Sequence, residues 1–213
     1  MTKPEIAQAA VAALKTEYPD AVCSLVSRSP LELLIATRLS AQCTDARVNL
    51  VTPALFARFP DLDAFCAASA AEIAPYIRSC GLYQTKARDI YAMCCAIRDR
   101  FGGEVPHTLD DLTSLPGVGR KTANLIMGDV YGAPAVVADT HCIRINNRLG
   151  LCDSKDPLKV ERRLRALLPP EESNAYCHRM VLHGRAVCDA RKPACSRCCM
   201  ASFCPRVGVT TAE

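Results

Sequence analysis

The sequence contains no tryptophan, few other aromatic residues and no long apolar run. Because Phe and Tyr supply only 5% of the chain, its core has to be built mainly from Leu, Ile, Val and Ala. A membrane-spanning helix needs about 20 predominantly apolar residues, and no run approaches that length. The opening stretch, Met1–Glu5, lacks the basic head and apolar segment of a secretory signal. We therefore expect a cytoplasmic protein, located at the nucleoid if its source is bacterial.

Cysteine, by contrast, is abundant, with 14 residues in the chain. A disulfide framework is typical of small secreted domains, and a half-hydrophobic chain of 213 residues can bury a core without one. Four cysteines stand close together near the C-terminus: Cys188, Cys195, Cys198 and Cys204. Four thiolates at this spacing can surround one metal centre, and the spacing alone admits zinc as well as an iron–sulfur cluster. We interpret most of the others as small buried hydrophobic side chains.

Charge is distributed unevenly along the chain. Residues 140–213 carry 13 Lys and Arg against 7 Asp and Glu, whereas residues 1–139 carry 13 against 15. A basic C-terminal third beside a nearly neutral body favours a polyanionic partner such as nucleic acid. A solvated basic face is the ordinary alternative, and the charge alone does not decide between them.

Helical periodicity and capping signals run through nearly the whole sequence. Helices are expected at residues 5–18, 31–42, 69–81, 85–100 and 108–116, and from residue 156 onward. Ser69 and Glu72 form a capping box, and Asp156 followed by Pro157 is a second helix start. Only residues 134–138 suggest a strand. The pattern predicts an all-α fold of many short helices, and any two domains must be interleaved because no flexible linker separates them.

A glycine-containing turn at residues 115–123, with the sequence L-P-G-V-G-R-K-T-A, joins a short helix to a longer one. Pro116 ends the first helix, and Gly117 and Gly119 allow a tight, left-handed backbone that a phosphate can approach. The positive end of the second helix, with Arg120, faces the same anion. A helix-hairpin-helix motif grips a nucleic-acid backbone in this way without reading its sequence. A plain glycine-capped turn between two helices is the alternative.

Two residues that follow this turn are candidates for catalysis. Lys121 lies in the first turn of the second helix, where neighbouring positive charge makes a lysine a better nucleophile, able to form a Schiff base. Asp139 follows an apolar run and precedes a predicted helix, so it can cap that helix and present a carboxylate for proton transfer. A solvated lysine and a simple N-cap are the ordinary alternatives. His141 suits a structural role or a DNA contact better than catalysis.

Taken in order, these motifs resemble the endonuclease III family of DNA repair glycosylases. The matching stretches are residues 39–45, 81–83, 115–123, 138–141, 147–150 and 183–185, followed by the four cysteines. The resemblance implies an all-α, two-domain helix-hairpin-helix glycosylase fold with a C-terminal iron–sulfur cluster loop. Residues 23–134 would form a six-helix domain containing the hairpin. Residues 1–22 and 135–213 would form a composite terminal domain, with the cluster loop at residues 188–204.

The resemblance also implies an activity and a set of site residues. Lys121 would be the nucleophile, Asp139 the catalytic carboxylate, and the four cysteines would hold a [4Fe–4S] cluster. The residues expected to contact DNA are Gln42, Leu82, Gly117, Gly119, Arg120, His141, Arg191 and Lys192. Gln42 and Leu82 would fill the gap left by an extruded nucleotide. The implied enzyme is a monomer that removes oxidised pyrimidines from double-stranded DNA and cleaves abasic sites by β-elimination through a lysine Schiff base.

Three other functions compete with this interpretation. A monofunctional adenine-mismatch glycosylase of the same superfamily would lack a lysine at position 121 and usually carries an extra C-terminal domain. A non-catalytic iron–sulfur protein that binds damaged DNA would need neither Lys121 nor Asp139, and an iron–sulfur electron carrier would not bind abasic DNA. Cys199 stands where the family often has proline, but Cys198 keeps both ligand spacings. Cys43 and Cys142 are unusual neighbours of the proposed functional residues.

Overall fold

The computed structural model describes residues 1–213, which form helices and loops without any β-strand, so the predicted all-α fold is confirmed. The α-helices are α1 (Lys3–Glu17), α2 (Pro30–Ser40), α3 (Asp45–Arg58), α4 (Leu62–Ala67), α5 (Ala70–Ile73), α6 (Tyr83–Phe101), α7 (Leu109–Thr113), α8 (Arg120–Asp129), α9 (Thr140–Arg148), α10 (Pro157–Arg165) and α11 (Ser173–Ala186). Three short 3₁₀ helices are η1 (Ala74–Cys80), η2 (Pro170–Glu172) and η3 (Cys195–Arg197). Residues 134–138 form no strand. None of the helices combines the length and hydropathy that a membrane span needs.

Local capping chemistry sets the helix ends where the sequence predicts them. The Ser69 hydroxyl accepts from the Glu72 N–H at 3.3 Å, and the Glu72 carboxylate accepts from the Ser69 N–H at 2.8 Å, which completes the capping box of α5. The helical path continues through η1 and stops at Gly81, whose φ is 61°. Asp156 caps α10 by accepting from the Leu158 N–H at 2.8 Å.

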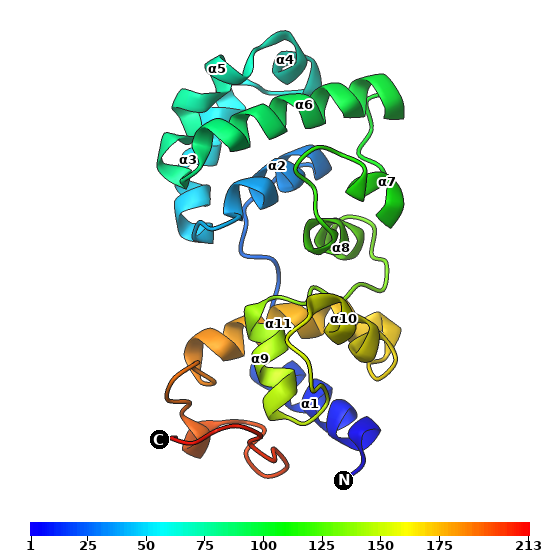
Figure 1. Cartoon of the computed structure of the whole chain (residues 1–213), viewed down its shortest axis with the longest axis vertical. Helices are drawn as coiled ribbons and strands as arrows, with labels where there is room; N and C mark the ends of the chain where they lie inside the picture. Colours follow the sequence, from blue (N-terminus) through cyan, green and yellow to red (C-terminus); the bar gives the residue numbers. More distant parts are fainter. The chain divides into compact units, whose positions relative to one another are not determined.

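The chain divides into two compact units. Residues Cys23–Tyr131 form one, called here the hairpin unit, and Met1–Val22 together with Gly132–Glu213 form the other, called the terminal unit. The chain therefore leaves the terminal unit after α1, builds α2 to α8, and returns to the terminal unit before α9 (Figure 1). Both chain ends belong to the terminal unit, so its helices come from distant parts of the sequence.

In the hairpin unit, α2 is the buried central helix. Its side chains Leu34, Ile35 and Leu39 are fully buried, and α3, α6, α8 and η1 pack around it. The few aromatic residues also contribute to this core, since Phe59 stacks near Phe65 with ring centroids 5.1 Å apart. Because α2 packs against four other helices of the unit, its C-terminal end can fix the loops that surround it.

In the terminal unit, α11 packs against both α1 and α9 (Figure 1). The fully buried Tyr176 of α11 donates its hydroxyl to Asn146 Oδ1 of α9 at 2.7 Å, which satisfies a polar group inside an apolar contact. Gly184 allows the closest approach of the two helices, because a Cβ there would lie 2.4 Å from His141 Nδ1. The cysteine-bearing tail follows α11 directly, so this helix contact fixes its starting point.

Candidate functional site

The turn between α7 and α8 has a left-handed backbone at only one of its two glycines. Gly117 has φ 73°, as the sequence predicts. The same prediction is wrong for Gly119, which is extended with φ −91° and ψ 170° and occupies the N-cap position of α8. Gly119 has no side chain to cap α8, so no capping side chain competes with an external acceptor such as phosphate at this helix start.

The hairpin turn rests on an ion pair between α2 and α6. Arg38 Nε and Nη2 donate to Asp89 Oδ2 at 2.9 and 2.5 Å. A Cβ on Gly117 would lie 2.8 Å from both Arg38 Nε and Asp89 Cβ. Position 117 therefore requires glycine for two reasons: its φ is positive, and the ion pair directly beneath leaves no room for a side chain.

The two candidate catalytic residues lie in different units. Lys121 is exposed in the first turn of α8, two residues after Gly119, in the hairpin unit. Asp139 is partly buried in the terminal unit and caps α9, where its Oδ1 accepts from the Cys142 N–H at 2.7 Å. The cap engages only Oδ1 and holds the carboxylate in a defined orientation.

Gln42 and Leu82 share an uncommon backbone conformation. Their φ values are 54° and 48°, and Arg206 is the only other non-glycine residue of the chain with positive φ. Such a conformation costs about 1–2 kcal/mol for an L-residue with a Cβ. Both side chains are nevertheless exposed, and Leu82 presents 63% of its surface to solvent. A strained backbone and an exposed leucine side chain do not stabilise the fold, and such features cluster at functional sites.

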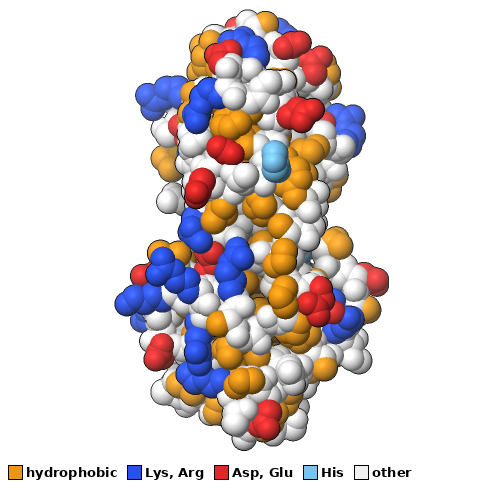
Figure 2. Space-filling model, turned by 90° about the vertical axis from the view of Figure 1, so that its right-hand side faces the viewer, with side chains coloured by type: hydrophobic (Ala, Val, Ile, Leu, Met, Phe, Trp, Pro, Cys, Tyr) orange, Lys and Arg blue, Asp and Glu red, His pale blue; other side chains and the backbone are white.

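The remaining predicted DNA-contacting residues include several exposed cations. Arg191 and Lys192 are exposed in the tail, and their backbone N–H groups donate to Asp189 Oδ1 at 2.8 and 3.2 Å. Arg120 is exposed at the start of α8, whereas His141 is partly buried, with Nδ1 3.1 Å from Arg144 Nη2. On the face shown in Figure 2, most of the visible Lys and Arg side chains of the terminal unit gather along one side.

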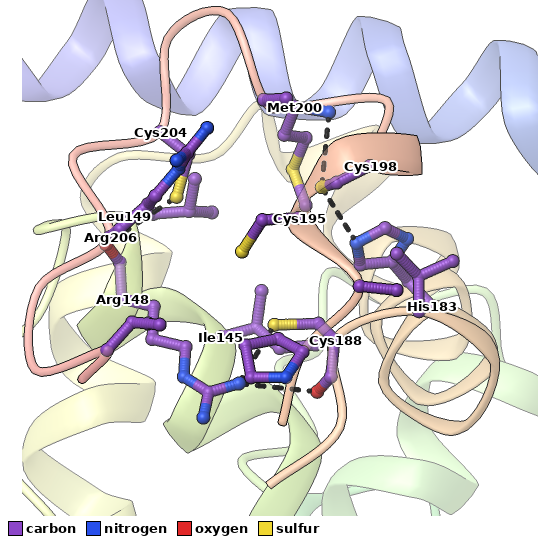
Figure 3. Close-up of a pocket in the computed structure, with 15 residues that line it drawn as sticks. Ile145, Arg148, Leu149, His183, Cys188, Cys195, Cys198, Met200, Cys204 and Arg206 are labelled. Atoms are coloured by element: carbon purple, nitrogen blue, oxygen red, sulfur yellow. Dashed lines mark hydrogen bonds between the residues drawn. The ribbon is translucent and has the colours of Figure 1, made fainter. Parts of the chain in front are cut away.

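The four cysteines of the C-terminal motif line one cavity (Figure 3). Its empty space is about 400 Å³ and partly open to solvent. Figure 3 shows the sulfur atoms of Cys188, Cys195, Cys198 and Cys204 around this common space, with Ile145, Leu149 and Met200 among the apolar residues of its wall. Cys199, the fifth cysteine of the tail, is not among the lining residues.

Two arginines of α9 fasten the first part of this cysteine loop. Arg148 Nη1 donates to Cys188 Sγ at 3.2 Å and to the carbonyl of Asp189 at 2.6 Å, and its Nη2 donates to the carbonyl of Ala190 at 2.8 Å. Arg144 Nη2 donates to the carbonyl of Cys188 at 2.9 Å. These guanidinium groups satisfy consecutive carbonyls of a loop that has no regular secondary structure to do so.

Cys198 lies in a polar environment that favours its thiolate. His183 Nε2 lies 3.3 Å from Cys198 Sγ, while His183 Nδ1 lies 3.2 Å from the hydroxyl of Tyr18. The Met200 N–H donates to Cys198 Sγ at 3.4 Å. A hydrogen bond from the Cys199 thiol, with further contributions from His183 and Met200, lowers the pKa of the Cys198 thiol to about 4. The thiolate is the form of cysteine that ligates metals.

The sequence did not predict three residues that hold the hairpin turn and the cysteine loop in place. Arg38 and Asp89 form the ion pair beneath the hairpin, and Arg148 holds the cysteine loop. A partial signal existed for Arg38, because it occupies the apolar face of the helix predicted at residues 31–42. A charged residue on a buried helix face needs a partner, but the periodicity does not identify which distant residue provides it.

The fold and motifs define a class of repair protein. Residues 35–170 match the family described as "HhH-GPD superfamily base excision DNA repair protein". Among solved structures, a trapped covalent endonuclease III–DNA intermediate matches with a TM-score of 0.90 and 43% identity over 97% of both chains. A thermostable thymine-DNA glycosylase has the same fold, with a TM-score of 0.84 at 21% identity, over 94% of this chain and 95% of that one.

Curated relatives narrow this class further. Endonuclease III of Synechocystis is 47% identical over 90% of this chain and 88% of its own length, and that of Bacillus subtilis is 43% identical over 88% and 86%. Endonuclease III of Escherichia coli K12 is 38% identical over 90% of both chains. This chain belongs to the endonuclease III family. It is a base-excision-repair enzyme with DNA glycosylase and abasic-site lyase activity.

We expect the two hairpin glycines to respond differently to alanine. In Gly117→Ala, the new Cβ would clash with the Arg38–Asp89 ion pair, and alanine would be held at a left-handed φ. The substitution should lower the free energy of unfolding by about 1–3 kcal/mol and weaken DNA binding. Gly119→Ala has open space and an extended backbone, so its stability should change by less than about 1 kcal/mol. Chemical denaturation and DNA titration measure both effects, and equal losses of stability would contradict the role of the Arg38–Asp89 pair.

Proposed function

We propose that this enzyme removes oxidised pyrimidines from double-stranded DNA and then cleaves the abasic site, acting as a monomer in the bacterial cytoplasm. The carrying observation is the position of Lys121, two residues after Gly119 in the first turn of α8. One rigid element thus presents both a phosphate-binding helix start and an amine. Support also comes from the similarity to an endonuclease III that was trapped in a covalent intermediate with DNA.

In the proposed reaction, the amine nitrogen of Lys121 forms a bond to C1′ of the damaged nucleotide. The bond between C1′ and the base breaks, and the base leaves with the bonding electrons and takes up a proton. The amine loses a proton, the C1′–O4′ bond opens, and O4′ takes up a proton, which leaves an iminium between C1′ and Lys121. Its positive charge acidifies C2′–H, so removal of that proton expels the 3′-phosphate by β-elimination. Water then hydrolyses the iminium and releases Lys121.

Asp139 serves this reaction as a carboxylate of fixed orientation. We assign it the acceptance of the amine proton and the stabilisation of positive charge that develops on the sugar. Its N-cap bond to the Cys142 N–H supports the assignment, because a carboxylate held by a helix start needs little reorganisation during the reaction.

The proposed DNA contacts are supported by the position and exposure of each residue. Gln42 and Leu82 would fill the gap left by the extruded nucleotide, which is supported by their exposed side chains and strained backbones. The remaining contacts would go to phosphates and sugars and involve Gly117, Gly119, Arg120, His141, Arg191 and Lys192. Such contacts position the enzyme on DNA without reading the base sequence.

The cavity of the cysteine loop fits the [4Fe–4S] cluster that the family resemblance implies. Cys188, Cys195, Cys198 and Cys204 would be its ligands, because all four line the same space and offer the soft thiolates that iron–sulfur clusters require. When bound, the cluster would act as a cross-link that fixes the tail.

The covalent step can be tested by replacing the nucleophile. Lys121→Gln keeps a polar, unbranched side chain with a similar helix propensity but removes the amine, so borohydride should trap no protein–DNA adduct on abasic DNA. The wild-type enzyme should give the adduct, seen as a shifted band in denaturing electrophoresis. Binding of abasic DNA by the variant serves as the control for folding. An adduct that persists in Lys121→Gln would assign the nucleophile elsewhere, and the absence of any wild-type adduct would favour a binding module.

The role of Asp139 is tested by Asp139→Asn. Asparagine caps helices about as well as aspartate, so α9 and the thermal midpoint should be preserved, together with DNA affinity. Loss of the carboxylate should slow base excision by about 10²–10⁴-fold. Single-turnover excision from an oxidised-pyrimidine duplex measures this, and excision at the wild-type rate would disprove the assignment.

The cluster assignment is tested by a matched pair of cysteine variants. Cys195→Ser should lose most of the iron, the visible absorbance and the order of the tail, because one of four ligands is missing. Cys199→Ser removes a neighbouring thiol outside the cavity lining, so it should retain about four irons per chain. Iron analysis and absorption spectra report the result without relying on activity. If Cys199→Ser loses iron while Cys195→Ser retains it, the ligand set is wrong.

A further inference from the structure

Lys86 of the hairpin unit is a buried charged residue that the reaction above does not use. Only 1% of its surface is exposed, although it lies in the first turn of α6, four residues after the exposed Leu82. Its Nζ donates to the carbonyl of Leu39 at 2.8 Å and to the carbonyl of Cys80 at 2.6 Å. Both acceptors are backbone carbonyls, so no carboxylate compensates the buried amine. Burial is the main cause that lowers the pKa of Lys86.

The two carbonyls belong to the ends of two different helices. Leu39 is the second-to-last residue of α2, and Cys80 is the last residue of η1. Helix ends leave carbonyls without intrahelical partners, and a buried end must find a donor elsewhere. One amine carries three N–H donors, so a single lysine can satisfy both ends and join them.

Each of these helix ends leads directly into one of the two strained residues. Gln42 follows Leu39 by three residues, and Leu82 follows Cys80 by two. The Lys86 backbone N–H also donates to the Leu82 carbonyl at 3.0 Å. Lys86 therefore contacts the backbone just before both left-handed residues, and it also contacts Leu82 itself, so this one side chain is joined to both loops.

We propose that Lys86 is a positioning residue that holds the loops of Gln42 and Leu82 in their strained, exposed conformations before DNA binds. Nucleotide extrusion from duplex DNA requires unstacking, and side chains that fill the gap help only if they are already in place. A loop that relaxed to an ordinary backbone would have to be ordered during binding. The inference rests on the proposed role of Gln42 and Leu82, but Lys86 itself touches no substrate.

The test compares Lys86→Met with a control on the same helix. Methionine fills a similar volume but donates no hydrogen bond, so both loops lose their shared anchor. Ile97→Ala serves as the control. Ile97 is fully buried on α6, about 16 Å further along the helix than Lys86. Its truncation should lower the stability but leave the bonds from Lys86 to the Leu39 and Cys80 carbonyls in place. Lys86→Gln, which retains a donor on a shorter side chain, is examined in parallel in case Lys86→Met does not fold.

Two measurements on the full-length holoenzyme report the result. Hydrogen–deuterium exchange of residues 40–43 and 80–83 should rise in Lys86→Met well beyond its rise in Ile97→Ala. Excision of an oxidised pyrimidine should then be compared between a fully paired duplex and a duplex with mismatches beside the lesion, where extrusion is easier. Lys86→Met should widen the rate difference between these substrates by about 10- to 100-fold, whereas Ile97→Ala should leave it unchanged.

The outcomes separate this inference from the proposed function. If the two loops stay protected and the substrate ratio keeps its wild-type value in the Lys86 variants, the positioning role is overturned while the lysine chemistry of Lys121 stands. If the wild-type enzyme gives no borohydride adduct, the proposed chemistry fails, and the exchange measurement still decides whether Lys86 holds the loops.

Discussion

Two charged residues one turn apart on α6 connect to the end of α2, and the exposed turns of the hairpin unit depend on these contacts. Lys86 binds the Leu39 carbonyl, and Asp89 binds the neighbouring Arg38. The first contact lies beneath the loops of Gln42 and Leu82, and the second lies beneath Gly117. Exposed, strained turns bury little apolar surface of their own, so hydrogen bonds in the low-dielectric interior have to hold them.

The basic excess of the chain does not lie in the hairpin unit. Residues 23–131 carry 11 Lys and Arg and 11 Asp and Glu, so the unit is formally neutral. At the start of α8, no capping side chain engages the backbone N–H groups. The terminal unit holds the basic excess. We infer that the first unit provides local geometry for phosphates and the second provides longer-range electrostatic attraction.

In the terminal unit, the tail beyond α11 has little hydrophobic core, so other contacts have to hold it in place. Arg144 and Arg148 satisfy the carbonyls of the first loop segment, and the four thiols enclose one cavity. The same helix, α9, begins at Asp139, so the capped carboxylate and the arginines that hold the cysteine loop share one rigid element of nine residues. Order in the tail and orientation of the carboxylate are thus structurally linked through α9.

The sequence by itself determined the all-α fold, the capped starts of several helices, the cysteine motif and the family, because capping, helical periodicity and ligand spacing act over a few residues. It also drew attention to Gly117 but was wrong about the conformation of Gly119, whose N-cap role depends on where α8 begins. Only the tertiary structure decided that Lys86 is buried and that it reaches Leu39, 47 residues away in the chain. Such a contact depends on which helix faces pack together, and neither local propensity nor residue spacing encodes that choice.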